Sequence, residues 1–89
     1  MARVVFTSHL QRHVACPETD VPAGTLRTAL DRVFAVHPRV RDYVLDEQGE
    51  LRKHVVVFID GRRLTDRTSL SDPVGERSEV YVLQALTGG

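Results

Sequence analysis

A single amphipathic helix, flanked on both sides by short β-prone segments, is the feature that most constrains how this chain can fold. The segment AGTLRTALDRVFAVHP, residues 23–38, contains one set of side chains spaced three or four positions apart: Leu26, Leu30, Val33, Phe34 and His37. Thr25 after Gly24 is a suitable N-cap, and Pro38 disfavours helical geometry in the residue before it. One helix with one apolar stripe has to cover an apolar sheet face, since neither could otherwise bury that surface.

Short valine-rich and aromatic segments supply the strands of that sheet. RVVFTS and RHVACPE near the N-terminus are typical of a hairpin whose second strand stops at Pro17. HVVVFI leads into Asp60-Gly61, a pair favoured in tight hairpin turns, and Leu64 is expected to begin a short return strand. SEVYVLQAL forms the last strand. The expected order is therefore strand, strand, helix, strand, short strand, strand.

The first and last strands, both rich in valine, are predicted to be parallel neighbours at the centre of the sheet. With the hairpins outside and the helix crossing one face, this is an α+β fold of the β-grasp type, a mixed sheet of four to five strands with one main helix. A ferredoxin-like fold is the alternative, but it requires a second full helix in the connector. There we expect only a helical turn through Val40, Tyr43 and Val44, then a turn at DEQG. TSLSDPVG is expected to be a loop.

Length and composition indicate one small folded domain. The chain has 89 residues, of which 42% are apolar and 27% are charged, a normal globular balance. We expect a domain over residues 1–86 and a flexible tail over residues 87–89. So small a domain has little room for a buried active-site cleft, and we expect neither an enzyme nor any catalytic residue.

The charges and the cysteine content exclude several kinds of partner. Twelve basic residues balance twelve acidic ones, so nucleic acid and anionic membranes are not expected to bind. The N-terminal segment is too short and too polar for a signal peptide, and Cys16 is the only cysteine, which indicates a cytoplasmic protein without disulfides. No metal is expected, because the four histidines lack ligand spacing: His9, His13, His37 and His54.

The carboxyl terminus carries the strongest functional signal. The chain ends in Gly-Gly directly after its last strand, an ending with a chance probability of about 0.5%. Together, VFIDGRRL and TSLSDPVGERSEVYVLQALTGG resemble the ubiquitin-like sulfur-carrier family, which includes the small subunit of molybdopterin synthase and the thiamine-pathway sulfur carrier. Members of that family end in Gly-Gly. The positions that match its turn, its loop and the entry into its last strand are Asp60-Gly61, Leu70 and Ser78-Glu79-Val80.

Two details refine this resemblance. Glu76-Arg77-Ser78 stands where many relatives have an Asp-Gly-Asp turn, which is a departure in the loop and not in the tail. The long connector RDYVLDEQGELRKHVVVFIDG resembles the larger carriers that supply sulfur for cysteine synthesis.

The resemblance implies a role for the tail. An E1-like adenylating enzyme would use ATP to activate the carboxylate of Gly89, and a sulfur donor would convert the adenylate to a thiocarboxylate for a sulfur-acceptor biosynthetic enzyme. Thr87 and Gly88 would give the enzyme access to Gly89. The chain would then be a monomeric co-substrate that binds no cofactor itself.

Two other functions use the same residues. In a protein modifier, the activated Gly89 would form an isopeptide bond to a target lysine. The sequence favours the carrier, because Lys53 is the only lysine available for building chains. In a plain interaction module, the tail would be inert.

The last strand also predicts a docking face. Alternation in EVYVLQAL places Val80 and Val82 on one side and Tyr81, Leu83 and Ala85 on the other. By resemblance to the apolar surface of ubiquitin-like proteins, we assign the two valines to the core. The residues assigned to partner binding are Tyr81, Leu83, Leu86 and Val57. The reverse assignment, with the valines outside, remains the alternative.

Overall fold

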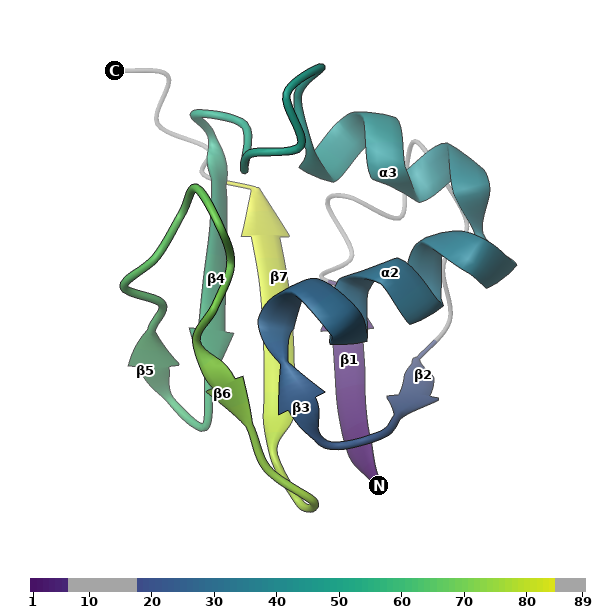
Figure 1. Ribbon diagram of the computed structural model, residues 1–89, viewed down its shortest axis with the longest axis vertical. Coiled ribbons are helices and arrows are strands. Elements are labelled where there is room, and N and C mark those ends of the chain that lie inside the picture. Colours follow the sequence, from purple (N-terminus) through teal and green to yellow (C-terminus); the bar gives the residue numbers. More distant parts are fainter. Residues whose placement is uncertain (7–17, 85–89) are drawn as a thin grey trace.

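The computed structural model describes residues 1–6 and 18–84, and only the backbone of Gln84. These residues form a five-stranded mixed sheet, a two-stranded ribbon and helices that cover one sheet face (Figure 1). The strands are β1 (Ala2–Phe6), β2 (Thr19–Val21), β3 (Gly24–Thr25), β4 (Val55–Ile59), β5 (Arg62–Arg63), β6 (Pro73–Val74) and β7 (Glu79–Gln84). The helices are α2 (Leu26–Val36) and α3 (Pro38–Val44).

The sheet has the order β2-β1-β7-β4-β5, with the first and last strands at its centre. β1 and β7 run parallel, in a register from Arg3 opposite Glu79 to Phe6 opposite Val82. The other pairs in this sheet are antiparallel. This is the β-grasp arrangement predicted from the sequence. The predicted parallel pairing of the first and last strands of the chain is confirmed.

Helix α2 begins and packs as its sequence predicts. The Thr25 hydroxyl accepts a hydrogen bond from the Thr28 amide (3.2 Å), and the Thr28 hydroxyl accepts one from the Thr25 amide (3.1 Å), forming a capping box. Pro38 starts the next helix instead of continuing this one. The stripe on α2 that faces the sheet is buried, and it comprises Leu26, Ala29, Leu30, Val33 and Phe34.

The connector contains more helix than the sequence predicts. The expected single turn is helix α3, with Val40 and Val44 buried against the core. The turn at DEQG is confirmed, because the Asp46 carboxylate accepts hydrogen bonds from the amides of Gln48 (2.9 Å) and Glu50 (3.0 Å). A second helix does not make the fold ferredoxin-like, since the strand order and the parallel β1–β7 pair are those of a β-grasp.

Two strands differ from the prediction. The antiparallel partner of β1 is Thr19–Val21, which follows Pro17 instead of preceding it. The strand expected in RHVACPE falls almost entirely on residues outside the described part of the chain. The segment TSLSDPVG, expected to be a loop, ends in β6, which pairs with β3 in front of the main sheet. Both observed strands are very short, and pairing with a distant segment stabilises them.

Two aspartates fold the loop that precedes β6. Asp66 accepts hydrogen bonds from the hydroxyl of Ser71 (2.6 Å) and from the amides of Ser69 (2.9 Å) and Thr68 (3.1 Å). Asp72 accepts one from the Thr65 amide (3.0 Å). The Ser71 hydroxyl, followed by the Ser69 amide, lowers the pKa of Asp66 to about 2. The Thr65 amide likewise lowers the pKa of Asp72.

These bonds predict acid sensitivity. A carboxylate whose pKa is lower in the folded protein stabilises it fully above the unfolded pKa, and that contribution is lost as pH falls toward the folded pKa. For Asp66 this window runs from its ordinary value of 3.8 down to about 2. We therefore expect the melting temperature to fall across this window, and Asp66→Asn to flatten part of the decline.

Calorimetry over a pH series measures this effect. Asp31→Asn is the matched control, since Asp31 is exposed on α2 and accepts no hydrogen bond from the described residues. An Asp66→Asn protein with the same pH slope as the unmodified chain would contradict the prediction.

Candidate functional site

The sheet face opposite the helices presents an apolar cluster. Side chains alternate along β1 and β4 between buried and half-buried positions, as expected for a sheet covered on one side. Tyr81 lies at the centre, opposite Val5 on one neighbouring strand and Phe58 on the other. We call this cluster the free sheet face, and its apolar members are Val5, Val56, Phe58, Tyr81 and Leu83.

The last strand is oriented as predicted. Val80 and Val82 are buried, while Tyr81 is 37% exposed and Leu83 is half-buried. The assignment of the valines to the core is therefore confirmed, and the reverse assignment is wrong.

Val57 does not lie on the free sheet face, so its assignment to partner binding is wrong. Val57 is fully buried opposite Val82, on the helix-covered side. Its neighbours Val56 and Phe58 take the outward positions, and sequence reasoning missed both. All five residues of β4 are apolar, so the sequence does not show which of them face the core. Only the pairing of β4 with β7 determines this. Pairing Val57 with the core-facing Val82 is the signal that would have placed Val56 and Phe58 on the outward side.

Charged groups occupy one end of the free sheet face. The Arg3 guanidinium lies 3.3 Å from a carboxylate oxygen of Glu79 and 3.7 Å from one of Glu18. The phenol of Tyr81 donates a hydrogen bond to the other Glu79 oxygen (2.9 Å). This hydrogen bond, together with the negative charge of Glu79, raises the pKa of Tyr81. The tyrosine ring is thereby oriented, and the apolar end of the face lies toward Leu83 and the tail.

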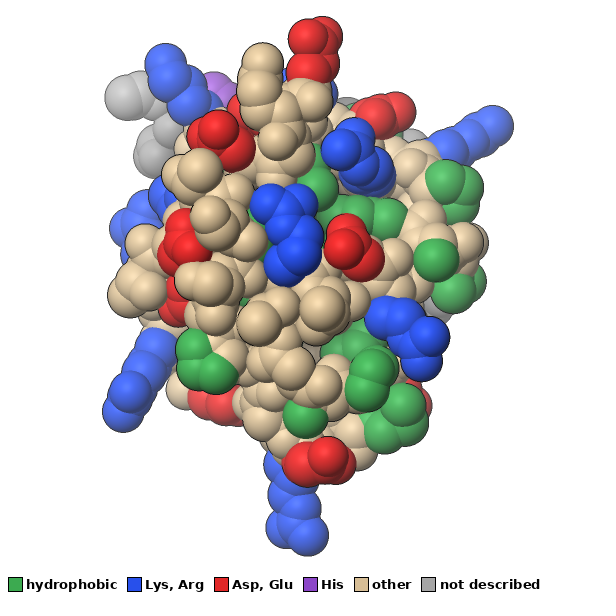
Figure 2. Space-filling model, in the orientation of Figure 1, with side chains coloured by type: hydrophobic (Ala, Val, Ile, Leu, Met, Phe, Trp, Pro, Cys, Tyr) green, Lys and Arg blue, Asp and Glu red, His purple; other side chains and the backbone are tan. Residues whose placement is uncertain are grey.

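The helix-covered side has a different character. Figure 2 shows that side chains of both charges are interspersed over the helices and loops, without a field of one sign. Such a surface is typical of a solvated face.

The Asp60-Gly61 turn fixes the start of β7. Both residues have positive φ angles, 52° and 80°, as a tight hairpin turn requires. The Asp60 carboxylate accepts hydrogen bonds from the Ser78 hydroxyl (2.7 Å) and from the Glu79 amide (2.9 Å). The Glu79 amide, followed by the Ser78 hydroxyl, lowers the pKa of Asp60. The return strand is Arg62–Arg63, so it begins earlier than the predicted Leu64.

Ser78 joins the turn before β7 to Asp60. Ser78 is buried, and its hydroxyl also accepts a hydrogen bond from the Gly75 amide (2.8 Å). A single hydroxyl thus connects the two ends of this turn with Asp60.

The tail itself lies outside the described residues. β7 ends at Gln84, and the predicted roles of Leu86, Thr87, Gly88 and Gly89 stay predictions. Lys53 is exposed just before β4, whose first residue pairs with Gln84. The only lysine therefore lies at the end of the sheet where β7 ends.

Two further properties concern only the described part of the chain. Within residues 1–6 and 18–84, no three His, Cys, Asp or Glu side chains are grouped so that they could hold a metal ion. The helices α2 and α3 are both too short to cross a membrane.

The sheet order, the helix-covered face and the free face define a small ubiquitin-like β-grasp protein. No family model and no curated protein matches the sequence, but solved structures match the whole fold. Small archaeal modifier protein SAMP1 from Haloferax volcanii is 24% identical, with a TM-score of 0.78 over 99% of this chain and 98% of that one. A chain of the Amycolatopsis orientalis BexX/CysO complex is 18% identical, with a TM-score of 0.82 and complete coverage of both chains.

Mycobacterium tuberculosis CysO is 16% identical, with a TM-score of 0.80 over 97% of this chain and all of the other. At these identities the likeness establishes the fold. The β-grasp fold predicted from the sequence is thus confirmed by solved structures that cover 97–100% of this chain.

Proposed function

We propose that this protein is a sulfur carrier whose C-terminal Gly89 is adenylated and then converted to a thiocarboxylate. The observation that carries the proposal is the placement of β7. This central strand forms the middle of the free sheet face and ends at Gln84, five residues before the terminal carboxylate. An enzyme that docks on the face is therefore close to the reacting end of the chain.

The chemistry requires little of the carrier beyond an accessible carboxylate. An oxygen of the Gly89 carboxylate attacks the α-phosphorus of ATP, which releases pyrophosphate and leaves an acyl adenylate. A sulfur nucleophile then attacks the carbonyl carbon, AMP leaves, and a thiocarboxylate remains. Glycine suits this step because no Cβ crowds the attacked carbonyl or obstructs the channel that the tail enters.

The free sheet face is proposed to dock on the adenylating enzyme. A half-buried apolar cluster with an exposed tyrosine, next to charged groups, is typical of a protein interface, where apolar anchors supply affinity and charges fix orientation. The Amycolatopsis orientalis structure is a complex of CysO with BexX, so a structural neighbour of this chain assembles with a protein partner. The same face would later be recognised by the enzyme that accepts the sulfur, in cofactor synthesis or in cysteine-type amino-acid synthesis.

A protein modifier is the second candidate, favoured by the neighbours that are modifiers by name, such as SAMP1. In that function the acyl adenylate is passed to a lysine amine of a target, which forms an isopeptide bond. The same adenylating step precedes both functions, so the product distinguishes them.

Mass spectrometry of the intact protein tests the proposal. After incubation with the cognate adenylating enzyme, ATP and sulfide, we expect a mass gain equal to the difference between sulfur and oxygen. Pyrophosphate release reports the adenylation step, and omission of ATP is the control. Lysine-linked conjugates without this mass gain would establish the modifier instead. An unchanged mass without pyrophosphate release would refute both.

A further inference from the structure

The outer edge of β5 has backbone hydrogen-bonding groups that have no partner among residues 1–6 and 18–84. β5 is the last strand in the sheet order, and in the described chain it pairs only with β4. The Leu64 amide donates to the Val57 carbonyl (3.0 Å), which fixes the phase of this antiparallel ladder. Since bonded and non-bonded pairs alternate, the pair of Phe58 and Arg63 is the non-bonded one. The N–H and C=O groups of Arg63 therefore point outward, away from β4.

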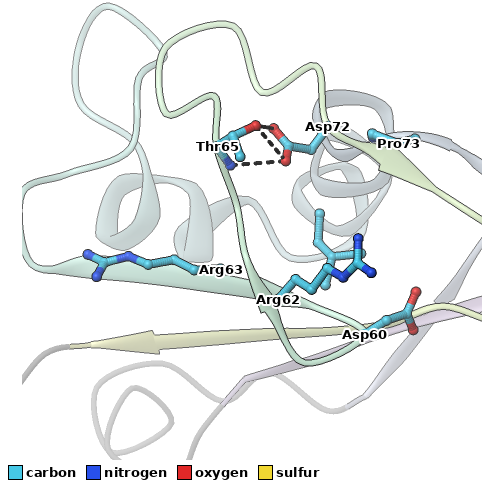
Figure 3. Close-up of a pocket in the computed structure, with 7 residues that line it drawn as sticks. Asp60, Arg62, Arg63, Thr65, Asp72 and Pro73 are labelled. Atoms are coloured by element: carbon cyan, nitrogen blue, oxygen red, sulfur yellow. Dashed lines mark hydrogen bonds between the residues drawn. The ribbon is translucent and has the colours of Figure 1, made fainter.

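A groove runs beside this edge. It has a volume of about 520 Å³ and lies between the β4–β5 hairpin and β6. Its apolar surface comes from Ile59 and Pro73, and the hydrogen-bonded pair of Thr65 and Asp72 forms the opposite rim (Figure 3). The groove is large enough for the side chains of a short peptide segment.

The two side chains of β5 are positively charged, and they lie beside the carboxylates of Asp60 and Asp72 in the lining of the groove. Arg62 and Arg63 are both exposed, and neither forms an ion pair in the described chain, where the ion pairs are those of Arg3. The nearby carboxylates already have partners. Asp72 accepts hydrogen bonds from Thr65 and Asp66, and Asp60 accepts them from the start of β7. Arg62 lies close enough to Asp60 for their charges to interact, but within the described chain neither guanidinium group is held in an ion pair, so both can bind a ligand.

We propose that the β5 edge binds an extended acidic segment of a partner protein, which adds to the sheet as a further strand. Side chains alternate along an added strand. Arg62 is paired with the core-facing Ile59 and serves the groove side, while Arg63 is paired with Phe58 and serves the free sheet face. Acidic residues on either side of the added strand would each meet one arginine, and the backbone would bond to Arg63.

A second copy of this chain is a poor occupant of the edge. Pairing of two β5 edges would bring the arginines of both copies together, and like charges on opposed strands are destabilising. The inference is independent of the proposed function, because it uses no residue of the tail.

Fluorescence polarisation tests the site with a labelled peptide in which pairs of glutamates alternate with pairs of valines, so that both faces of an added strand carry glutamates. We expect Arg62→Glu and Arg63→Glu each to weaken binding at least about tenfold at low salt. Arg63→Pro should also weaken it, because proline removes the outward N–H without breaking a bond to β4. Arg39→Glu, the same charge change on the exposed surface of α3, should leave binding unchanged. Melting temperatures establish that each variant is folded.

Three outcomes would overturn the proposal. The same peptide with lysine in place of each glutamate would remove the electrostatic basis if it bound equally well, and an equal loss with Arg39→Glu would indicate general attraction. Absence of binding up to about 1 mM would mean that the two arginines only protect the edge from aggregation. If amide chemical shifts in the unmodified protein change at Arg63 and around the groove, the site is located as proposed.

Discussion

Deletion of Gly89 is expected to abolish formation of the thiocarboxylate while leaving the fold intact. The adenylating enzyme must align one carboxylate with the α-phosphorus of ATP, and shortening the chain by one residue withdraws that group by about 3.3–3.6 Å. The last buried residue of the described chain is Val82, seven positions before Gly89 in the sequence. The melting temperature should therefore stay constant while the mass gain disappears.

Two companion variants separate position from chemistry. Extension by one alanine after Gly89 keeps both glycines but moves the carboxylate, and it should be inactive. Gly89→Ala keeps the length and adds only a Cβ beside the reacting carbonyl, so it should react more slowly. Intact-mass measurement over time distinguishes these results. If the shortened chain were converted as fast as the original, the rate would not depend on the length of the tail, and the proposed geometry would be wrong.

Arginine substitutions at two adjacent positions of β7 are expected to affect different properties, folding at one and partner binding at the other. Val82→Arg places an unpaired charge in the core, where Val82 is fully buried, and should cost about 4 kcal/mol or more. This is a large part of the roughly 5–15 kcal/mol that stabilises a domain, so the variant should be largely unfolded. Leu83→Arg lies on the free sheet face, where the long side chain can reach water. It should remain folded but lose about 2 kcal/mol or more of partner binding.

Circular dichroism measures the folding of both variants, and calorimetric titration with the adenylating enzyme measures the binding of Leu83→Arg. Arg77→Ala, an exposed position before β7, is the control that should change neither. Unimpaired binding by a folded Leu83→Arg protein would show that the enzyme docks elsewhere.

The features that the sequence predicted are those with local causes. The capping threonines, the apolar stripe of α2 and the following Pro38 all act within the helix or next to it, so its limits could be read directly. The Asp60-Gly61 turn is local in the same sense, since its two positive φ angles depend on those two residues. The first and last strands of the chain could be placed together at the centre of the sheet because both are rich in valine.

The features that were missed depend on distant residues. Helix α3 has only seven residues, too few to be stable alone, and it forms because Val40 and Val44 pack against the core. β6 contains Pro73, which strands rarely accommodate, and it exists because β3 lies beside it. The outward positions of Val56 and Phe58 depend in the same way on the register with β7. Within the candidate site, the sequence therefore predicted the residues that β7 contributes to the free sheet face, but not those of β4.

The parallel pairing of β1 with β7 also affects when the protein can fold. Arg3 contacts Glu79 across 76 positions of sequence, so the central pair cannot form until almost the whole chain has been synthesised. Contacts of such long range slow folding, because a large loop must close before they stabilise the chain. A nascent chain that terminates before β7 would lack the middle strand of its sheet and remain open to proteolysis. Only chains that include β7, the strand after which the glycine tail follows, can therefore complete the sheet and escape proteolysis.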